Sequence, residues 1–130
     1  MGRYLKHLAV ATLAFLFLLS GVALAHTYHS TLSFTWQLTG TERPYANDDI
    51  HISLCSHESV NRPIDSYNIK LFRDEFGWDD SHIGTVTVPR EGCSNTRTWT
   101  NAGSGTYFFV FVKADDGARV WSDLVHMWGT

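Results

Sequence analysis

The chain has 130 residues, of which 44% are hydrophobic and 18% are charged, and its 13 acidic and 10 basic side chains give a net charge of −3 at pH 7. This length suits one domain of ordinary size. The basic residues do not cluster, which argues against nucleic acid and anionic lipid as partners, because both need a concentrated patch of Lys and Arg.

Residues 1–25 are predicted to be a secretory signal peptide. Two basic residues precede an apolar run from Leu8 to Leu19, and Ala23-Leu24-Ala25 provides a small-residue cleavage site directly before His26. A membrane-spanning helix needs roughly 20 apolar residues, so the shorter run favours a cleaved signal over a retained anchor. Cleavage after Ala25 would make His26 the amino terminus, and a second possible cut follows Ala23.

Residues 26–130 are expected to form one secreted domain of short β-strands, without membrane insertion. Apolar and polar side chains alternate over most segments between turn residues, a period typical of half-buried strands. About seven such strands and no amphipathic helix predict an all-β fold, a single antiparallel β-sandwich that is Ig-like or jelly-roll-like. The predicted strands are Leu32–Leu38, Ile50–Cys55, Tyr67–Phe72, Ile83–Val88, Cys93–Thr100, Thr106–Lys113 and Val120–Met127.

Three features of these strands give more specific expectations. Trp36 alternates with polar neighbours and is therefore expected in the core. Thr106–Lys113 is apolar on both faces, which indicates a central strand. Asp115-Asp116-Gly117 carries the Asp-Gly signal of a hairpin, so Val120–Met127 is predicted to return beside that central strand.

Cys55 and Cys93 are the only cysteines, and in an exported chain they are predicted to form one disulfide. The C-x-x-C spacing of a redox or metal-binding thiol is absent from the sequence. Closing a loop of this length stabilises a domain by roughly 3–4 kcal/mol on the chain-entropy model.

No sequence pattern indicates catalysis, and we expect a protein that is not an enzyme. The histidines form no H-E-x-x-H or spaced Cys/His zinc pattern, and Gly103-Ser104-Gly105 lacks the spacing of a nucleophile elbow. Paired carboxylates can hydrolyse glycosides, and loop carboxylates can bind calcium, but the spacing of a calcium loop is absent. The acidic pairs, all in predicted loops, are Asp48-Asp49, Asp74-Glu75, Asp79-Asp80 and Asp115-Asp116.

Cleavage after Ala25 would give His26 two nitrogens for a metal ion. Its α-amino group, with a pKa of about 8, and its imidazole would form a chelate at neutral pH. A second imidazole would complete a nitrogen-rich site that suits copper. His29 is the nearest candidate in the sequence for that imidazole, and His51 and His126 are the alternatives.

This arrangement resembles the histidine brace of small exported copper carriers and copper-dependent oxidases, which are also built on β-sandwiches. In the carriers, a late strand that starts Gly-Thr-Tyr leads to a turn with an Asp and the second His. Gly105-Thr106-Tyr107 and Asp115-Asp116-Gly117 stand in similar places here, but Ala118 follows instead of a histidine. The resemblance implies copper as the one cofactor to consider, bound by His26 with a ligand other than residue 118.

The aromatic side chains give the best indication of binding. Trp78 stands beside Phe76 in an acidic predicted loop, where an exposed indole can stack on a sugar or enter a protein partner. Trp99, Trp121 and Trp128 cannot all face one interior if their strands alternate. Trp99 and Trp121 are therefore further binding candidates, with plain packing as the alternative.

These features predict a small secreted protein, extracellular, periplasmic or cell-wall-associated, that binds an extracellular protein or glycan or acts in the cell envelope. The alternative from another class is copper binding through His26 and His29. A third possibility is a secreted toxin or inhibitor that acts through the Trp78 loop.

Overall fold

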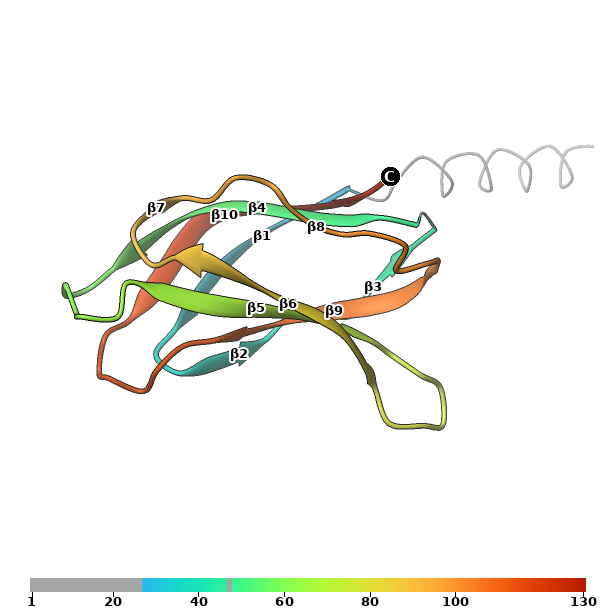
Figure 1. Cartoon of the computed structure of the whole chain (residues 1–130), viewed down its shortest axis with the longest axis horizontal. Helices are drawn as coiled ribbons and strands as arrows, with labels where there is room; N and C mark the ends of the chain where they lie inside the picture. Colours follow the sequence, from blue (N-terminus) through green and yellow to red (C-terminus); the bar gives the residue numbers. More distant parts are fainter. Residues whose placement is uncertain (1–26, 47) are drawn as a thin grey trace, which may run out of the picture.

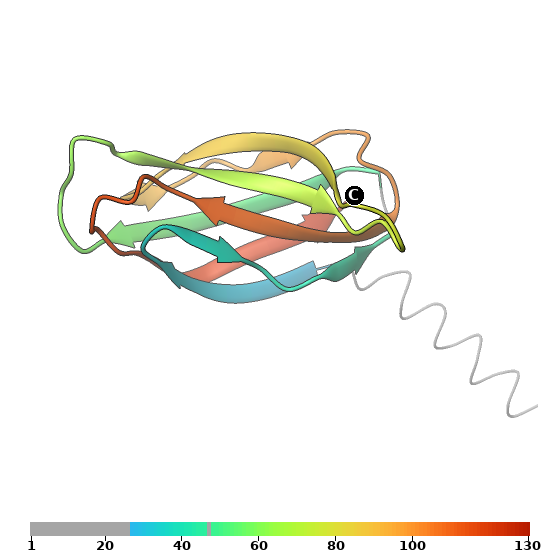
Figure 2. The same cartoon turned by 90° about the horizontal axis from the view of Figure 1, so that it is seen from below.

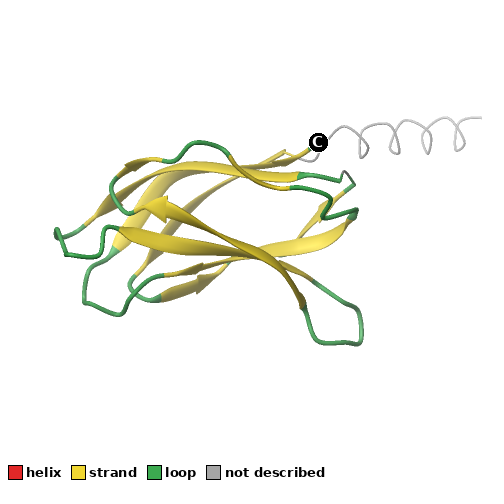
Figure 3. Ribbon diagram, viewed as in Figure 1, coloured by secondary structure: helices red, strands yellow, loops and turns green. Residues whose placement is uncertain are grey.

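The structure is a computed structural model that describes residues 27–46 and 48–130. Over these ranges the chain forms ten strands and no helix (Figures 1 and 3). The described residues therefore contain no helix with the length and apolar character needed to cross a membrane. All strand pairs are antiparallel, and the two sheets pack face to face. The predicted antiparallel β-sandwich is therefore confirmed, whereas the predicted signal peptide and His26 lie outside the described residues.

Each sheet contains five strands. The first sheet has the order β1 (Thr27–Phe34), β10 (Val120–Gly129) and β4 (Ile50–Glu58), with the short β7 (Gly92–Cys93) and β8 (Arg97–Trp99) both paired to β4. The second sheet has the order β2 (Gln37–Thr39), β9 (Gly105–Val112), β5 (Ser66–Arg73) and β6 (Ser81–Pro89), with β3 (Arg43–Tyr45) paired to β9. Figure 2 shows the second sheet in front of the first.

The core lies between the sheets and consists of alternate residues from the long strands. In β4, Ile50 and Ile52 are fully buried, while His51 between them is half-buried and faces outward. β9 differs, because it is buried without interruption from Tyr107 to Phe111 and has paired strands on both sides. The predicted central strand is confirmed.

The predicted strand Leu32–Leu38 is in fact two strands in different sheets. β1 pairs with β10 in the first sheet, and β2 pairs with β9 in the second, so the chain crosses between sheets at residues 35–36. Trp36 stands at this corner, where its carbonyl accepts a hydrogen bond from Lys113 N–H at 2.9 Å and its side chain is 57% exposed. The expectation that Trp36 lies in the core is wrong, because the crossing changes the direction of its side chain.

The connection from β9 to β10 is not the predicted hairpin. β9 belongs to the second sheet, whereas β10 pairs with β1 and β4 in the first. Residues 113–119 therefore cross between the sheets. The Asp-Gly signal does mark a turn in this crossing, where Gly117 has a φ of 81°, but the strands on either side of the turn do not pair.

Asp116 in this crossing is bound by two buried cations. Arg90 Nη1 donates a hydrogen bond to Asp116 Oδ2 at 2.7 Å, Lys113 Nζ donates to Oδ1 at 3.0 Å, and both cationic side chains are 0% exposed. The bonds from Lys113 and Arg90 hold the pKa of the Asp116 carboxyl well below its usual range. Arg90 Nε also donates to the Ser66 carbonyl at 3.1 Å, so the cluster joins the crossing to the start of β5.

The lowered pKa of Asp116 predicts that acid weakens the fold. A carboxyl whose folded pKa lies below its unfolded value of about 3.9 contributes stability that is present above that value and is lost as the pH falls through the folded pKa. We expect Asp116→Asn to lower the free energy of unfolding at neutral pH and to reduce its further decline below about pH 4. Urea unfolding of both proteins across this pH range measures the difference.

Asp115→Asn is the matched control for this experiment, because Asp115 is exposed and belongs to the same crossing. This variant should follow the wild type at every pH. An acid decline equally steep in wild type and Asp116→Asn would contradict a stabilising role for the Asp116 carboxylate.

Cys55 in β4 and Cys93 in β7 form the predicted disulfide, with their Cα atoms 3.9 Å apart. Both residues are exposed, so the bond lies on the surface of the first sheet and outside the core. It attaches the two-residue strand β7 to β4 at a place where the backbone ladder is short.

Candidate functional site

The most exposed large apolar side chains of the described chain lie at the tip of the β5–β6 hairpin. Phe76 is 98% exposed and Trp78 is 84% exposed. The two strands pair along their length, and the tip, residues 74–80, projects from the second sheet as the yellow-green loop of Figure 1. The structure therefore places both predicted binding residues on one exposed turn.

Hydrogen bonds fix the conformation of this tip. Trp78 N–H donates to the Glu75 carbonyl at 2.9 Å and closes a turn in which Gly77 has a φ of 76°, a left-handed conformation that glycine adopts without strain. At the base of the tip, Asp74 N–H donates to a β9 carbonyl at 2.8 Å, and the Ser81 hydroxyl donates to Glu75 Oε1 at 3.1 Å. The two aromatic rings are thus presented on a preorganised turn.

The tip is strongly acidic. Asp74, Glu75, Asp79 and Asp80 lie close together, and Arg73 is the single base among residues 73–80. Arg73 Nε lies 3.9 Å from Glu75 Oε1, and the three aspartates form no ion pair within the described part of the chain. A molecule that contacts the aromatic rings therefore also meets uncompensated negative charge.

Trp99, another predicted binding residue, is a core side chain. It is 6% exposed, and its ring centroid lies 5.6 Å from that of Phe109. It also packs over Gly84, where a Cβ would come within 3.1 Å of the indole. A side chain buried in this way cannot contact a partner, so Trp99 does not contribute to a binding surface.

Trp121 and Trp128 lie on the outer face of the first sheet, away from Trp99. Strict alternation would put side chains seven residues apart on opposite faces, and the register shift between Trp121 and Val125 brings these two to the same face. The Arg119 guanidinium lies 4.3 Å from the Trp121 ring centroid, and the His57 ring lies 5.6 Å away. His57 belongs to the neighbouring strand β4, Arg119 directly precedes β10, and Trp121 is half-buried between them. The predicted candidate Trp121 therefore offers less free ring surface than Phe76 or Trp78.

The same outer face carries a row of stacked rings that sequence reasoning did not find. Trp128 stacks with His51 at 5.1 Å and with His126 at 4.3 Å, and His126 stacks with His29 at 4.6 Å between ring centroids. His51 is held in place by hydrogen bonds with two hydroxyls, that of Thr98 at 2.8 Å and that of Thr130 at 2.6 Å. The strand register, which brings distant residues together on one face, creates this row.

His29 and His126 differ from His51 because neither ring has a hydrogen bond in the described part of the chain. Desolvation, and then the neighbouring His29, lower the pKa of His126, which favours its neutral form. The described residues contain no group of three or more His, Cys, Asp or Glu side chains suited to a metal ion. The pair therefore supplies two imidazoles, and His26, the predicted chelating residue, lies outside the described ranges.

No protein-family model matches the sequence, and no curated protein matches it with significant similarity. Among solved structures, the chain is similar to the CBM36-1 domain of a multidomain xylanase from the hindgut metagenome of Trinervitermes trinervoides. The sequence identity is 18%, over 82% of this chain and 74% of that chain, and the TM-score is 0.30. A likeness this distant assigns no ligand to this chain.

Proposed function

We propose that this protein is a non-catalytic binding protein that inserts its Phe76–Trp78 tip into an apolar groove with a basic rim on an extracellular partner protein. The observation that carries the proposal is the exposure of these two aromatic rings, 98% and 84%, on a turn that backbone hydrogen bonds hold in place. Aromatic side chains dominate the energy of many protein interfaces, and a preorganised turn loses little conformational entropy on binding.

The shape and charge of the tip favour a protein groove over other partners. The tip projects from the sheet (Figure 3), so a complementary surface has to be concave. The four carboxylates around the rings repel anionic lipid headgroups and attract Lys and Arg. Burial of each aromatic ring removes about 150–250 Å² from water, and the acidic rim aligns the two proteins as they meet.

Trp78→Ala is expected to weaken partner binding by about 30- to 700-fold, which corresponds to the loss of an interfacial hot spot of about 2–4 kcal/mol. Because Trp78 is 84% exposed, the same substitution should leave the free energy of unfolding nearly unchanged. A photo-reactive phenylalanine analogue at position 76 identifies the cross-linked partner, and biolayer interferometry with that purified partner gives the dissociation constants.

Trp36→Ala is the matched control, since Trp36 is also exposed but lies at the corner between β1 and β2, away from the tip. Binding by this variant should equal that of the wild type. Full binding by Trp78→Ala would refute the proposal. The proposal would also be refuted if the wild type bound polysaccharides on a glycan array and the tip variants lost that binding.

A second candidate function is copper binding by His29 and His126, because their stacked rings bring two imidazoles together at 4.6 Å. Neutral imidazole nitrogen is a good ligand for Cu(II), and small rotations of two adjacent side chains can direct both nitrogens to one ion. If the mature chain begins at His26, its amino and imidazole nitrogens could complete the site, and amino-terminal sequencing tests this condition.

His126→Ala should weaken Cu(II) binding by at least about tenfold, because it removes one nitrogen ligand. Isothermal titration of the mature protein with Cu(II) measures the change. His57→Ala is the matched control, since His57 lies on the same face but pairs with Glu91 at 3.1 Å. Equal affinities for the wild type and His126→Ala would exclude this site.

A further inference from the structure

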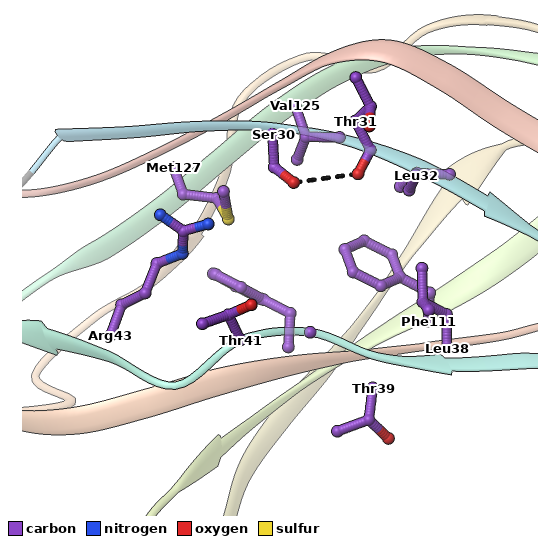
Figure 4. A pocket seen from close by; sticks show the side chains of 12 residues that line it. Ser30, Thr31, Leu32, Leu38, Thr39, Thr41, Arg43, Phe111, Val125 and Met127 are labelled. Atoms are coloured by element: carbon purple, nitrogen blue, oxygen red, sulfur yellow. Dashed lines mark hydrogen bonds between the residues drawn. The ribbon is translucent and has the colours of Figure 1, made fainter.

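A cavity of about 180 Å³ opens between the two sheets at the edge where β1 faces β2 and β3 (Figure 4). Serine and threonine side chains and one arginine, Arg43, line its more exposed part. The wall is apolar and comes from both sheets, through Leu32, Leu38, Phe109, Phe111, Val125 and Met127.

The cavity opens because both sheet edges are interrupted at the same place. The pairing of β1 with β10 shifts register between Ser30 and Leu32. On the opposite side of the cavity, β2 ends at Thr39 and β3 begins at Arg43, so the edge of the second sheet is interrupted at residues 40–42. Gly40 is still attached to β9 where this interruption begins: its N–H donates to a β9 carbonyl at 2.8 Å, and a Cβ there would make a tight contact of 3.2 Å with the same oxygen.

Among the described residues that line the cavity, Arg43 is the only one with a charged side chain. Its guanidinium carbon lies 4.8 Å from the Tyr28 ring centroid, and the Tyr28 hydroxyl donates to the Pro44 carbonyl at 2.6 Å. No carboxylate pairs with Arg43 in the described ranges, and Figure 4 shows its side chain extending from β3 toward Met127. Its N–H donors are therefore available to an anion at the opening, in a planar arrangement that fits a carboxylate.

We propose that this cavity binds a small amphipathic carboxylate, with its apolar part between the sheets and its carboxylate on Arg43. The volume sets the size of the ligand, because an apolar cavity of about 150 Å³ holds benzene, and 180 Å³ accommodates roughly six to eight carbon atoms. The charge sets the chemistry of its head group. This site is distinct from the exposed aromatic tip, and its occupancy does not depend on a protein partner.

Octanoate, octan-1-ol and octylammonium are suitable probes, because they share one chain and differ in the charge of the head group. Isothermal titration of the wild type should give the tightest binding for octanoate and the weakest for octylammonium. Arg43→Gln should weaken octanoate binding by about 10- to 100-fold, the effect of losing a charge-assisted hydrogen bond, and leave octanol binding unchanged. Arg62→Gln is the control, since Arg62 is exposed in the loop after β4.

Ser30→Leu tests the cavity itself, because it adds apolar volume to a lining position without removing a core side chain. This variant should stay folded and lose the binding of both octanoate and octanol. In ¹⁵N-resolved NMR spectra of the wild type, octanoate should shift the amides of β1, β2 and β10 around the opening. No binding of octanoate at millimolar concentration, equal binding of octanoate and octylammonium, or unchanged binding by Ser30→Leu would overturn the proposal.

Discussion

Removal of the Cys55–Cys93 disulfide is expected to lower the free energy of unfolding by about 4 kcal/mol. The two cysteines are 38 residues apart in the sequence, and cross-linking a loop of that length removes a corresponding amount of conformational entropy from the unfolded chain. Both residues are exposed, so their replacement creates no cavity in the core. For a domain of this size, the melting temperature should fall by about 15–30 °C.

The double variant Cys55→Ser with Cys93→Ser, compared with oxidised wild type by calorimetry and urea unfolding, measures this loss. Wild type treated with a reducing agent is the control, and it should unfold at the same temperature as the double variant. A change of less than about 1 kcal/mol would show that the β4–β7 connection constrains the unfolded chain far less than its loop length implies.

Trp99→Ala is expected to destabilise the protein by about 3–5 kcal/mol, the usual range for deleting a large aromatic side chain from a core. Trp99 is 6% exposed and packs against Phe109 and the backbone of β6 at Gly84, so its loss leaves a void between the sheets. Urea unfolding followed by far-ultraviolet circular dichroism measures the loss without relying on tryptophan fluorescence.

Two further variants separate packing from polarity at this position. Trp99→Phe should be less damaging than Trp99→Ala, because it keeps an aromatic ring and removes a buried indole N–H that has no hydrogen-bond partner among the described residues. Trp128→Ala removes an indole from the outer face and should destabilise by about 1 kcal/mol or less. Equal losses for Trp99→Ala and Trp128→Ala would contradict the placement of Trp99 in the core.

The sequence predicted those parts of the fold that depend on local patterns. Alternation of side chains along the strands indicated the sandwich, and the apolar residues 107–112, which occupy both faces of their strand, indicated the central strand. Alternation could not reveal that β1 and β2 belong to different sheets, because a half-buried strand has the same period in either sheet. The misplacement of Trp36 follows from that ambiguity. The incorrect β9–β10 hairpin came from the Asp-Gly signal, which marks a turn but does not determine whether the flanking strands pair.

The candidate sites also fall into two groups: those that a local sequence pattern indicates and those that depend on how distant strands pair. Phe76 and Trp78 could be identified from the sequence because a glycine and several acidic residues around them mark an exposed turn. The stacking of His29 on His126 depends on the register between the first and last strands of the structure. The cavity at Arg43 depends on two interrupted edges that face each other across the core, and no local pattern connects them.

The pairing of β1 with β10 also determines when the protein can fold. β1 is an edge strand, and its ladder partner is the last strand of the chain. A chain that leaves the ribosome amino terminus first therefore holds residues 27–34 without a partner until residues 120–129 have been synthesised. The entropy of closing a loop over nearly the whole domain has to be overcome before this ladder forms, so we expect the first sheet to form late in folding, after residues 120–129 have been synthesised. Deletion of β10 would leave β1 and β4 without their shared neighbour and expose two unpaired strand edges to aggregation.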